Sequence, residues 1–411
     1  MLKERFLRTF SYVWGPQIEF GCNSIQKLKD IVESMNTKKV LLITDKGIIN
    51  VGFHKMVKEL LEDADAEYEI YDKVMPNPLD SIVEDGAALA KKVKPDLILG
   101  LGGGSVIDTA KGISLLTTNP GSIREYEVRS PEDFGKIKNY TTPLITIPTT
   151  SGTGSEANFW AIITNTEKWN KMAIGGPPSY PGGPCIAAKI AILDPLLTKS
   201  LPPKQTAVTG IDALTHAIEA YTAAVANPVS DALAEYAIRV IGEYLPIAYG
   251  NGNDIEAREM MTLAACLAGI SFSNSDCAGV HCLGEALGGV YGNPPKPVIP
   301  HGLACSLFLP WVMEYNYITD PVKFANIAKL LGENIEGVPL MLAAKKSIDA
   351  VKQLIKTLEL PSSLKELKVV EEDLPRIAER ATWNVSVNSN PRPLKYEDFL
   401  TILNKAYVGW Q

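Results

Sequence analysis

Histidine and cysteine are both scarce in this sequence, and the cysteines form no common motif. Four histidines occur among 411 residues, and the six cysteines include no Cys-x-x-Cys pair. The cysteine spacing therefore favours neither a disulfide framework nor a thiolate zinc site. No run approaches the roughly 20 apolar residues of a membrane helix, and no Lys/Arg block could follow a phosphate backbone. We accordingly expect no membrane partner and no nucleic-acid partner.

The composition and the start of the chain predict a soluble cytoplasmic protein. Residues Met1–Phe6 run into polar residues without the hydrophobic core of a secretion signal. The chain is 46% hydrophobic and 21% charged, with a formal net charge of −7. A globular chain of this length predicts about two domains with ample core. The cysteines are expected to be reduced and mostly to fill the core.

The first half alternates short apolar runs with amphipathic stretches. Residues 39–44, 96–101 and 142–147 are strongly apolar but too short for helices, so each predicts a buried strand. Residues 81–92 carry apolar side chains at helical spacing. Strands separated by such helices imply parallel crossovers. This half is predicted to be a doubly wound α/β domain.

The second half has a different pattern. From about Gln205 onward, long segments rich in Ala, Leu and Ile follow a helical period, and no segment reads convincingly as a strand. Prolines 195, 202 and 203 interrupt the periodicity between Asp194 and Pro203. We predict an α/β domain over residues 1–196 and an all-helical domain over residues 197–411.

Two segments are too rich in proline and glycine for either a helix or a central strand. They are residues 175–184 and 291–297. One interpretation is that both are surface loops. The other is that they line a cleft, since loops on rigid scaffolds often carry function.

A glycine-rich turn suggests a nucleotide site. Residues 102–104 are glycines that follow a predicted strand and lead through Ser105 into a helix. Glycine allows close approach to a phosphate, and the helix start supplies free N–H groups. Asp45 follows another strand, where a carboxylate would bind a ribose hydroxyl and repel a 2′-phosphate, which favours NAD over NADP. Residues 148–156 add several hydroxyl groups. The alternative is a tight turn without a ligand, and the order differs from the usual dinucleotide fingerprint.

Three of the four histidines fall in the helical half. Asp212 and His216 are four residues apart in a helical stretch, so both side chains leave one face. His281 and His301 lie further along. A carboxylate with three imidazoles forms an oxygen and nitrogen set for a divalent first-row metal, with a position open for a substrate oxygen. The alternative is three unrelated histidines satisfied by backbone partners.

Several motifs follow one another along the whole chain. The most specific are Gly102–Ser105 with Asp108 and Lys111, Pro148–Thr150 with Gly152, Thr153 and Glu156, Gly210–Glu219, and Pro300–Gly302. Shorter matches are Thr44–Lys46, Pro76–Pro78, Leu193–Pro195 and Asn390–Arg392. Together they resemble the iron-containing, or group III metal-dependent, alcohol dehydrogenases.

This resemblance implies a dinucleotide-binding α/β domain, a helical metal-binding domain and a cleft between them. It implies that Fe(II) or Zn(II) is held by Asp212, His216, His281 and His301. It also implies NAD(H) contacts from a set of residues in the first half, namely Asp45, Asn77, Gly103, Gly104, Ser105, Asp108, Thr149, Thr150, Thr153 and Lys171. A homo-oligomer, a dimer or larger, is implied in the same way.

The implied activity is hydride transfer between NAD(H) and a small primary alcohol or aldehyde, with aldehyde reduction as the expected direction. The runner-up is an enzyme of the same scaffold that uses NAD within one cycle, a transhydrogenase or a dehydroquinate synthase-like lyase. The lyase is disfavoured because its phosphorylated substrate would need more Lys and Arg near the metal. A metal or nucleotide sensor without turnover is a third possibility.

The chain departs from the family pattern near the expected substrate. Glu285 stands where many members have a second histidine, four residues after His281. It is either a proton relay, if burial raises its pKa, or a helix residue bordering the pocket while protons leave by another route. Trp160 and Phe272 are either core aromatics or walls that narrow the pocket. Cys282 has no neighbouring base that would make it reactive, so we interpret it as structural.

Overall fold

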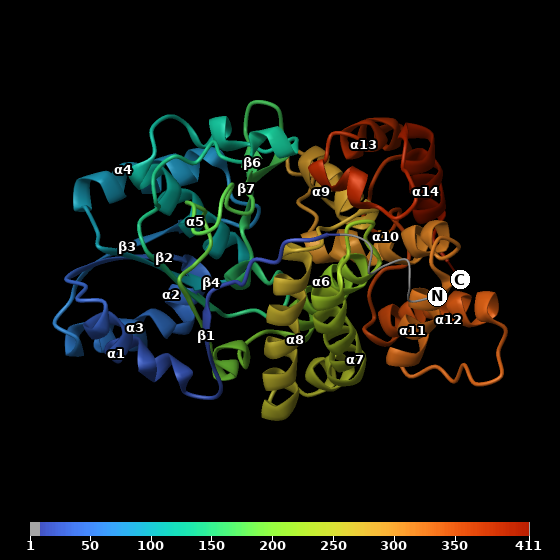
Figure 1. The fold of residues 1–411 in the computed structure, drawn as a ribbon, viewed down its shortest axis with the longest axis horizontal. Coiled ribbons are helices and arrows are strands. Elements are labelled where there is room, and N and C mark those ends of the chain that lie inside the picture. Colours follow the sequence, from blue (N-terminus) through green and yellow to red (C-terminus); the bar gives the residue numbers. More distant parts are fainter. Residues whose placement is uncertain (1–8, 411) are drawn as a thin grey trace.

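The computed structural model describes residues 9–410, in which a parallel sheet packs beside a bundle of helices (Figure 1). Six strands form the sheet in the order β1-β8-β5-β4-β2-β3, and all of their pairings are parallel. Their bounds are β1 Gln17–Phe20, β2 Lys39–Asp45, β3 Glu67–Val74, β4 Leu97–Gly102, β5 Leu144–Pro148 and β8 Ile190–Leu193. The three predicted strands are confirmed as β2, β4 and β5.

The starts of two strands differ from the prediction for identifiable reasons. Asp96 precedes β4, and its carboxylate accepts hydrogen bonds from the backbone N–H groups of Lys38 and Lys39. It therefore ties the start of β2 to the start of β4. β5 begins at Leu144, directly after Pro143, whose nitrogen has no hydrogen to donate.

Helices cover both faces of the sheet. They are α1 Leu28–Ser34, α2 Lys46–Val51, α3 Phe53–Asp63, α4 Asp80–Val93 and α5 Gly104–Thr118. Leu41 and Ile43 of β2 belong to the core formed with α4 and α5. Val40 and Leu42 belong to the core formed with α1 and α3. Successive side chains of one strand thus face opposite helical layers, which confirms the doubly wound α/β fold.

A separate antiparallel hairpin lies between the sheet half and the helical half. It consists of β6 Trp160–Asn165 and β7 Asn170–Gly175. Figure 1 shows it beside α9, and Arg380 of α13 donates hydrogen bonds to the carbonyl oxygens of Lys168 and Trp169 at its turn. The hairpin therefore lies at the junction of the sheet half and the helical half.

The rest of the described chain is helical, as predicted. The helices are α6 Pro203–Thr222, α7 Pro228–Gly250, α8 Ile255–Ser273, α9 Gly279–Tyr291, α10 His301–Asn316, α11 Pro321–Leu330, α12 Leu340–Thr357, α13 Leu374–Ala381 and α14 Tyr396–Val408. They share one large apolar core. Within residues 9–410 no strand follows Leu193, and no helix is long and apolar enough to cross a membrane. The expectation about a secretion signal falls in residues 1–8, outside the described part.

The two proline- and glycine-rich segments are loops beyond Gly175 and Tyr291. Residues 175–184 pack beside residues 126–137. Neither segment lies among the described residues that line the cleft between the halves. The surface-loop interpretation therefore describes them better than the cleft-lining one.

Candidate metal centre and nucleotide cleft

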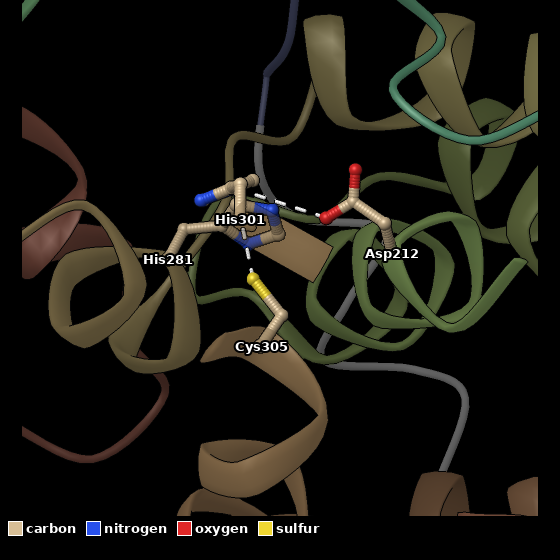
Figure 2. A group of neighbouring side chains, drawn as sticks. All are labelled: Asp212, His281, His301 and Cys305. Carbon is tan, nitrogen blue, oxygen red and sulfur yellow. Dashed lines mark hydrogen bonds and ion pairs between the residues drawn. The ribbon is translucent and has the colours of Figure 1, made fainter. Parts of the chain in front are cut away.

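The four predicted metal ligands meet in the helical half. Asp212 and His216 lie one turn apart on α6, His281 lies in the first turn of α9, and His301 begins α10. The ring centroids of His216 and His281 are 4.3 Å apart, and those of His281 and His301 are 5.3 Å apart. His301 Nε2 lies 3.7 Å from Asp212 Oδ1. Figure 2 shows Asp212, His281 and His301 converging on one point.

Three buried atoms of this group have no hydrogen-bond partner in the described structure: Asp212 Oδ1, His216 Nδ1 and His281 Nε2. Leaving such atoms unpaired costs roughly 1–3 kcal/mol each, and native proteins rarely tolerate it. Asp212 and His281 belong to one group of possible metal donors, and His216 belongs with His281 to a second, adjoining group. The oxygen and nitrogen donors of these residues are of the kind that Fe(II) or Zn(II) takes.

The electrostatics of the centre also fit a bound cation. Burial raises the pKa of Asp212 to about 6, although the charge of His281 opposes the rise. Burial lowers the pKa of His216 well below its usual value, and the neighbouring His281 and His301 lower it further. Neutral imidazoles are the form that binds a metal.

Glu219 is a functional residue that the sequence analysis quoted but did not assign. Its Oε2 lies 2.6 Å from His281 Nδ1, and its two oxygens accept hydrogen bonds from the backbone N–H groups of Ala278 and Val280. Burial lowers the pKa of His281, but Glu219 outweighs it and the net pKa is raised. A carboxylate on the far nitrogen orients a ligating histidine. Glu219 lies seven residues after Asp212 on the same helical face. This spacing was the signal in the sequence that could have placed Glu219 near the metal centre.

Cys305 also reaches the centre, although the sequence analysis gave it no role. It lies one turn after His301 on α10, and its Sγ is 3.6 Å from His301 Nε2 (Figure 2). The six cysteines are all free, as expected.

The glycine-rich turn has the shape that a phosphate needs. It joins β4 to α5, and no side chain caps the first turn of α5. A Cβ on Gly104 would lie 2.5 Å from Thr153 Cγ2, and one on Gly103 would lie 3.3 Å from Thr150 Cγ2. Glycine therefore lets the threonine loop close against the turn. Thr149 joins this arrangement through its N–H, which donates to the carbonyl of Gly102.

Three of the remaining predicted cofactor residues, Asn77, Asp108 and Lys171, line one cavity with this turn, and Asp45 lies on β2, the neighbour of β4. Asp45 ends β2, and its Oδ1 accepts the N–H of Ile48 at the start of α2, which leaves Oδ2 available. Lys171 Nζ donates to Asn77 Oδ1 at 2.7 Å, so these two distant residues meet. Both oxygens of Asp108 bind within the protein, to Ser155 Oγ at 2.5 Å and to the N–H of Ile162 at 2.9 Å.

One cavity of about 150 Å³ joins the turn to the metal centre. Its wall includes Gly104, Ser105, Asn77 and Lys171 from the sheet half, and all four predicted metal ligands from the helical half. Trp160 and Phe272 line the same cavity. The Phe272 ring stacks on His216 with centroids 4.5 Å apart. The two aromatics therefore border the pocket.

Glu285 borders this cavity as well. It lies one turn after His281, and Asn384 Nδ2 donates to its Oε2 at 2.6 Å. Burial raises the pKa of Glu285, while the charges of His281 and Lys171 oppose the rise. Burial also lowers the pKa of Lys171 to about 8.

Asp276 supports the wall that carries Asn384, and no sequence signal pointed to it. Its two oxygens accept hydrogen bonds from Ser386 Oγ at 2.7 Å and Ser389 Oγ at 2.6 Å. These partners are more than 100 residues away along the chain, so only the tertiary structure brings them together.

A second cavity of about 570 Å³ continues outward from Lys171, Glu285 and Asn384. Lysine and arginine gather on it, because Arg129, Lys168 and Arg380 line it together with Lys171. The scarcity of cations near the site, which disfavoured a lyase in the sequence analysis, is therefore not observed.

Comparison with known proteins gives consistent results over nearly the whole chain. A family model described as "Iron-containing alcohol dehydrogenase" matches residues 15–195, and one described as "Fe-containing alcohol dehydrogenase family, C-terminal" matches residues 206–407. The 1,3-propanediol dehydrogenase of Klebsiella pneumoniae is 38% identical over 402 residues, covering 97% of this chain and 99% of the relative. The NAD-dependent methanol dehydrogenase of Bacillus methanolicus is 36% identical over 391 residues, covering 95% and 98%.

A solved structure agrees with these sequence matches. The crystal structure of a 1,3-propanediol oxidoreductase superposes with a TM-score of 0.90 at 38% identity, covering 97% of this chain and 100% of that chain. The match extends over both halves and over the cleft between them. The chain therefore belongs to the iron-containing alcohol dehydrogenase family, whose members are oxidoreductases acting on CH–OH groups.

Proposed function

We propose that this chain is an NAD(H)-linked, divalent-metal-dependent dehydrogenase of small primary alcohols and aldehydes, with aldehyde reduction as its working direction. One observation carries the proposal: three unpartnered, buried donor atoms face the same cavity as a glycine turn at an uncapped helix start. The relatives support it, since two of them are named for 1,3-propanediol and methanol, and one of those for NAD.

The metal would be held by Asp212, His216, His281 and His301, with Glu219 orienting His281. NAD would contact the residues that the family resemblance implies, with Gly103, Gly104 and Ser105 at the pyrophosphate and Asp45 at the ribose. When bound, the metal polarises the oxygen of the substrate and the nicotinamide supplies or accepts the hydride. The choice between Fe(II) and Zn(II) depends on supply as well as on affinity.

Two side chains shape the substrate space and a third handles a proton. Trp160 and Phe272 narrow the cavity beside the metal ligands and keep water out. Glu285 holds a proton on its carboxylate beside this cavity, favoured by the burial that raises its pKa. We propose that it donates this proton during aldehyde reduction and recovers it during alcohol oxidation.

The decisive test is aldehyde-dependent oxidation of NADH by the purified protein. The assay uses a panel of short-chain aldehydes, before and after chelation and after adding back Fe(II) or Zn(II). Activity that chelation abolishes and one metal restores supports the proposal. No turnover, with NADH and metal still bound, would instead favour the lyase, the transhydrogenase or the sensor.

The pocket assignment has its own test. Trp160→Ala should extend the range of accepted chain lengths, because the indole borders a cavity of only about 150 Å³. An additional methylene in an apolar pocket changes kcat/KM by roughly 10-fold or more. An unchanged preference would assign Trp160 to the core.

The remaining parts of the proposal concern the domain division, the oligomeric state and the location of the protein. We propose a domain division into residues 1–196 and 197–411, supported by the end of β8 at Leu193 and the start of α6 at Pro203. A homo-oligomer and a cytoplasmic location are proposed on the family resemblance and the composition. The lyase-like alternative is not favoured, since the relatives reported above are named dehydrogenases.

A further inference from the structure

We propose that Cys305 supplies a sulfur ligand to the metal, beside Asp212, His281 and His301, and that this sulfur makes the site prefer Zn(II) over Fe(II). The inference rests on the metal-dependent function proposed above and deepens it. It adds a donor to the four that the family resemblance implies.

The first argument is the position of the thiol. Cys305 follows His301 by one turn of α10, so both side chains leave the same face. The side chain is completely buried, and Figure 2 shows it pointing at the imidazole of His301. One ligand atom from each of Asp212, His281, His301 and Cys305 can be chosen so that all four lie within 4.8 Å of one another.

The second argument is the set of distances between the donor atoms of this group. An ion with nitrogen at roughly 2.0–2.1 Å and sulfur at about 2.3 Å separates these two atoms by about 3.6 Å when the angle between the two ligands is about 110°. Cys305 Sγ and His301 Nε2 are 3.6 Å apart. Asp212 Oδ1 is 3.7 Å from the same nitrogen. Both distances are those of two ligands that share one ion.

The third argument is that neighbouring donors are unpartnered and buried. Asp212 and His281 are each 3% exposed, and Asp212 Oδ1 and His281 Nε2 make no hydrogen bond in the described structure. Cys305 also interacts with the Asp212 carboxylate, so its sulfur lies beside one of these residues as well as beside His301. A shared ion satisfies all of them, and metal binding releases the thiol proton to solvent.

The chemical consequence is selectivity. Carboxylate and imidazole suit several first-row ions, whereas a thiolate is a soft ligand that suits zinc. Replacing the sulfur by a hydroxyl oxygen weakens that preference with little change in the shape of the side chain.

The test uses Co(II) as a spectroscopic substitute for zinc in the full-length protein. Metal-free protein is loaded with Co(II) without oxygen, and sulfur-to-cobalt charge-transfer absorption is recorded in the near ultraviolet. We expect the band in the unmodified protein and its loss in Cys305→Ser. Absence of the band before substitution, or its persistence in Cys305→Ser, would overturn the proposal.

Two further cysteines provide matched controls. Cys277 is the rival source of sulfur, because it groups with His216 and His281. Cys282 is buried next to His281 in the sequence and belongs to neither donor group. Cys277→Ser and Cys282→Ser should both retain the band. Loss of the band in Cys277→Ser alone would transfer the ligand role to Cys277 and refute the assignment.

A measurement without any variant covers the case in which Cys305→Ser does not fold. X-ray absorption of the zinc-loaded protein should contain one sulfur scatterer at about 2.3 Å, and a shell of only nitrogen and oxygen would refute the proposal. Where the variant folds, its preference for Zn(II) over Fe(II) should fall about tenfold. Failure of aldehyde reduction would affect only the proposed function, since these measurements need no substrate.

Discussion

Each half of the molecule contains a buried polar cluster. The two clusters differ in whether their polar atoms have hydrogen-bond partners. In the sheet half, Lys111 is completely buried on α5. Its ammonium donates to Ser155 Oγ, to both oxygens of Asn158 and to the carbonyl of Trp160, at distances between 2.6 and 3.2 Å. This cluster is complete without any ligand.

The cluster around His281 in the helical half is incomplete. Asp212 Oδ1, His216 Nδ1 and His281 Nε2 are buried just as deeply and have no hydrogen-bond partner in residues 9–410. Burying an unpaired polar atom destabilises a fold, so such atoms persist where a ligand completes them. The comparison teaches that a buried cluster whose polar atoms are satisfied supports the structure, whereas several unsatisfied polar atoms gathered in one place indicate a functional centre.

The largest expected effect comes from removing a donor of the incomplete cluster. His216→Leu should lower activity on the order of 10⁴-fold, equivalent to about 5 kcal/mol, because the proposed metal site loses a ligand. Its metal-free form should be as stable as the unmodified metal-free protein to within about 1 kcal/mol, since the substitution also removes an unpaired buried nitrogen. Metal content, turnover and urea unfolding check both parts. A large loss of stability in the metal-free variant would contradict this distinction between the two clusters.

The opposite result is expected for the complete cluster. Lys111→Met should destabilise the protein by about 3–5 kcal/mol, because it leaves buried acceptors and the nearby Asp108 carboxylate without a cation. The free energy of urea unfolding measures this directly. Lys91→Met, at an exposed position of α4, is the control and should change stability by less than about 0.5 kcal/mol. Equal effects for the two variants would contradict a structural role for Lys111.

Glu219 connects the two kinds of cluster, since its carboxylate is fully hydrogen-bonded and yet orients a metal ligand. Glu219→Gln should weaken metal affinity or activity by about 10–100-fold, because an amide can no longer accept from both sides. Competition with a chelator measures the affinity. Glu243→Gln on the exposed face of α7 should leave it unchanged. Unaltered affinity in Glu219→Gln would show that the backbone alone positions His281.

The sequence predicted the fold class and the glycine turn because both depend on local patterns. The short apolar strands that are buried along almost their whole length, the helix predicted over residues 81–92 and the turn at 102–105 all follow from local hydrophobic pattern and glycine conformation. The spacing of Asp212 and His216 likewise placed both on one helical face. Each of these features depends on a few consecutive residues, so it could be predicted without knowledge of the tertiary packing.

Other parts of the site depend on contacts between distant segments. His281 and His301 entered the candidate ligand set by residue type and then by the family resemblance, since nothing local brings α9 and α10 to α6. Lys111 carries no signal of burial, because lysine is usually exposed. Cys305 had a usable signal, its one-turn spacing from His301, but a single cysteine matches no common metal-binding motif.

Glu285 is intermediate between the satisfied and the unsatisfied cluster, and its substitution gives the smallest predicted effect. Asn384 satisfies its Oε2, and the raised pKa keeps its carboxyl protonated to higher pH than usual. In the proposed mechanism the protonated carboxyl donates to the substrate oxygen during aldehyde reduction, so the rate should fall as pH rises through the raised pKa. Alcohol oxidation needs the ionised form, so its rate should rise over the same range.

Glu285→Gln should remove this dependence, because an amide neither donates nor accepts a catalytic proton. We expect about a tenfold loss of kcat/KM for reduction at the acidic end and little change at the alkaline end. The measurement is kcat/KM for both directions from roughly pH 5 to 9. Glu127→Gln, on the outer cavity, is the control. A pH profile that Glu285→Gln leaves unchanged would assign the carboxylate to the wall of the pocket, with protons leaving by another route.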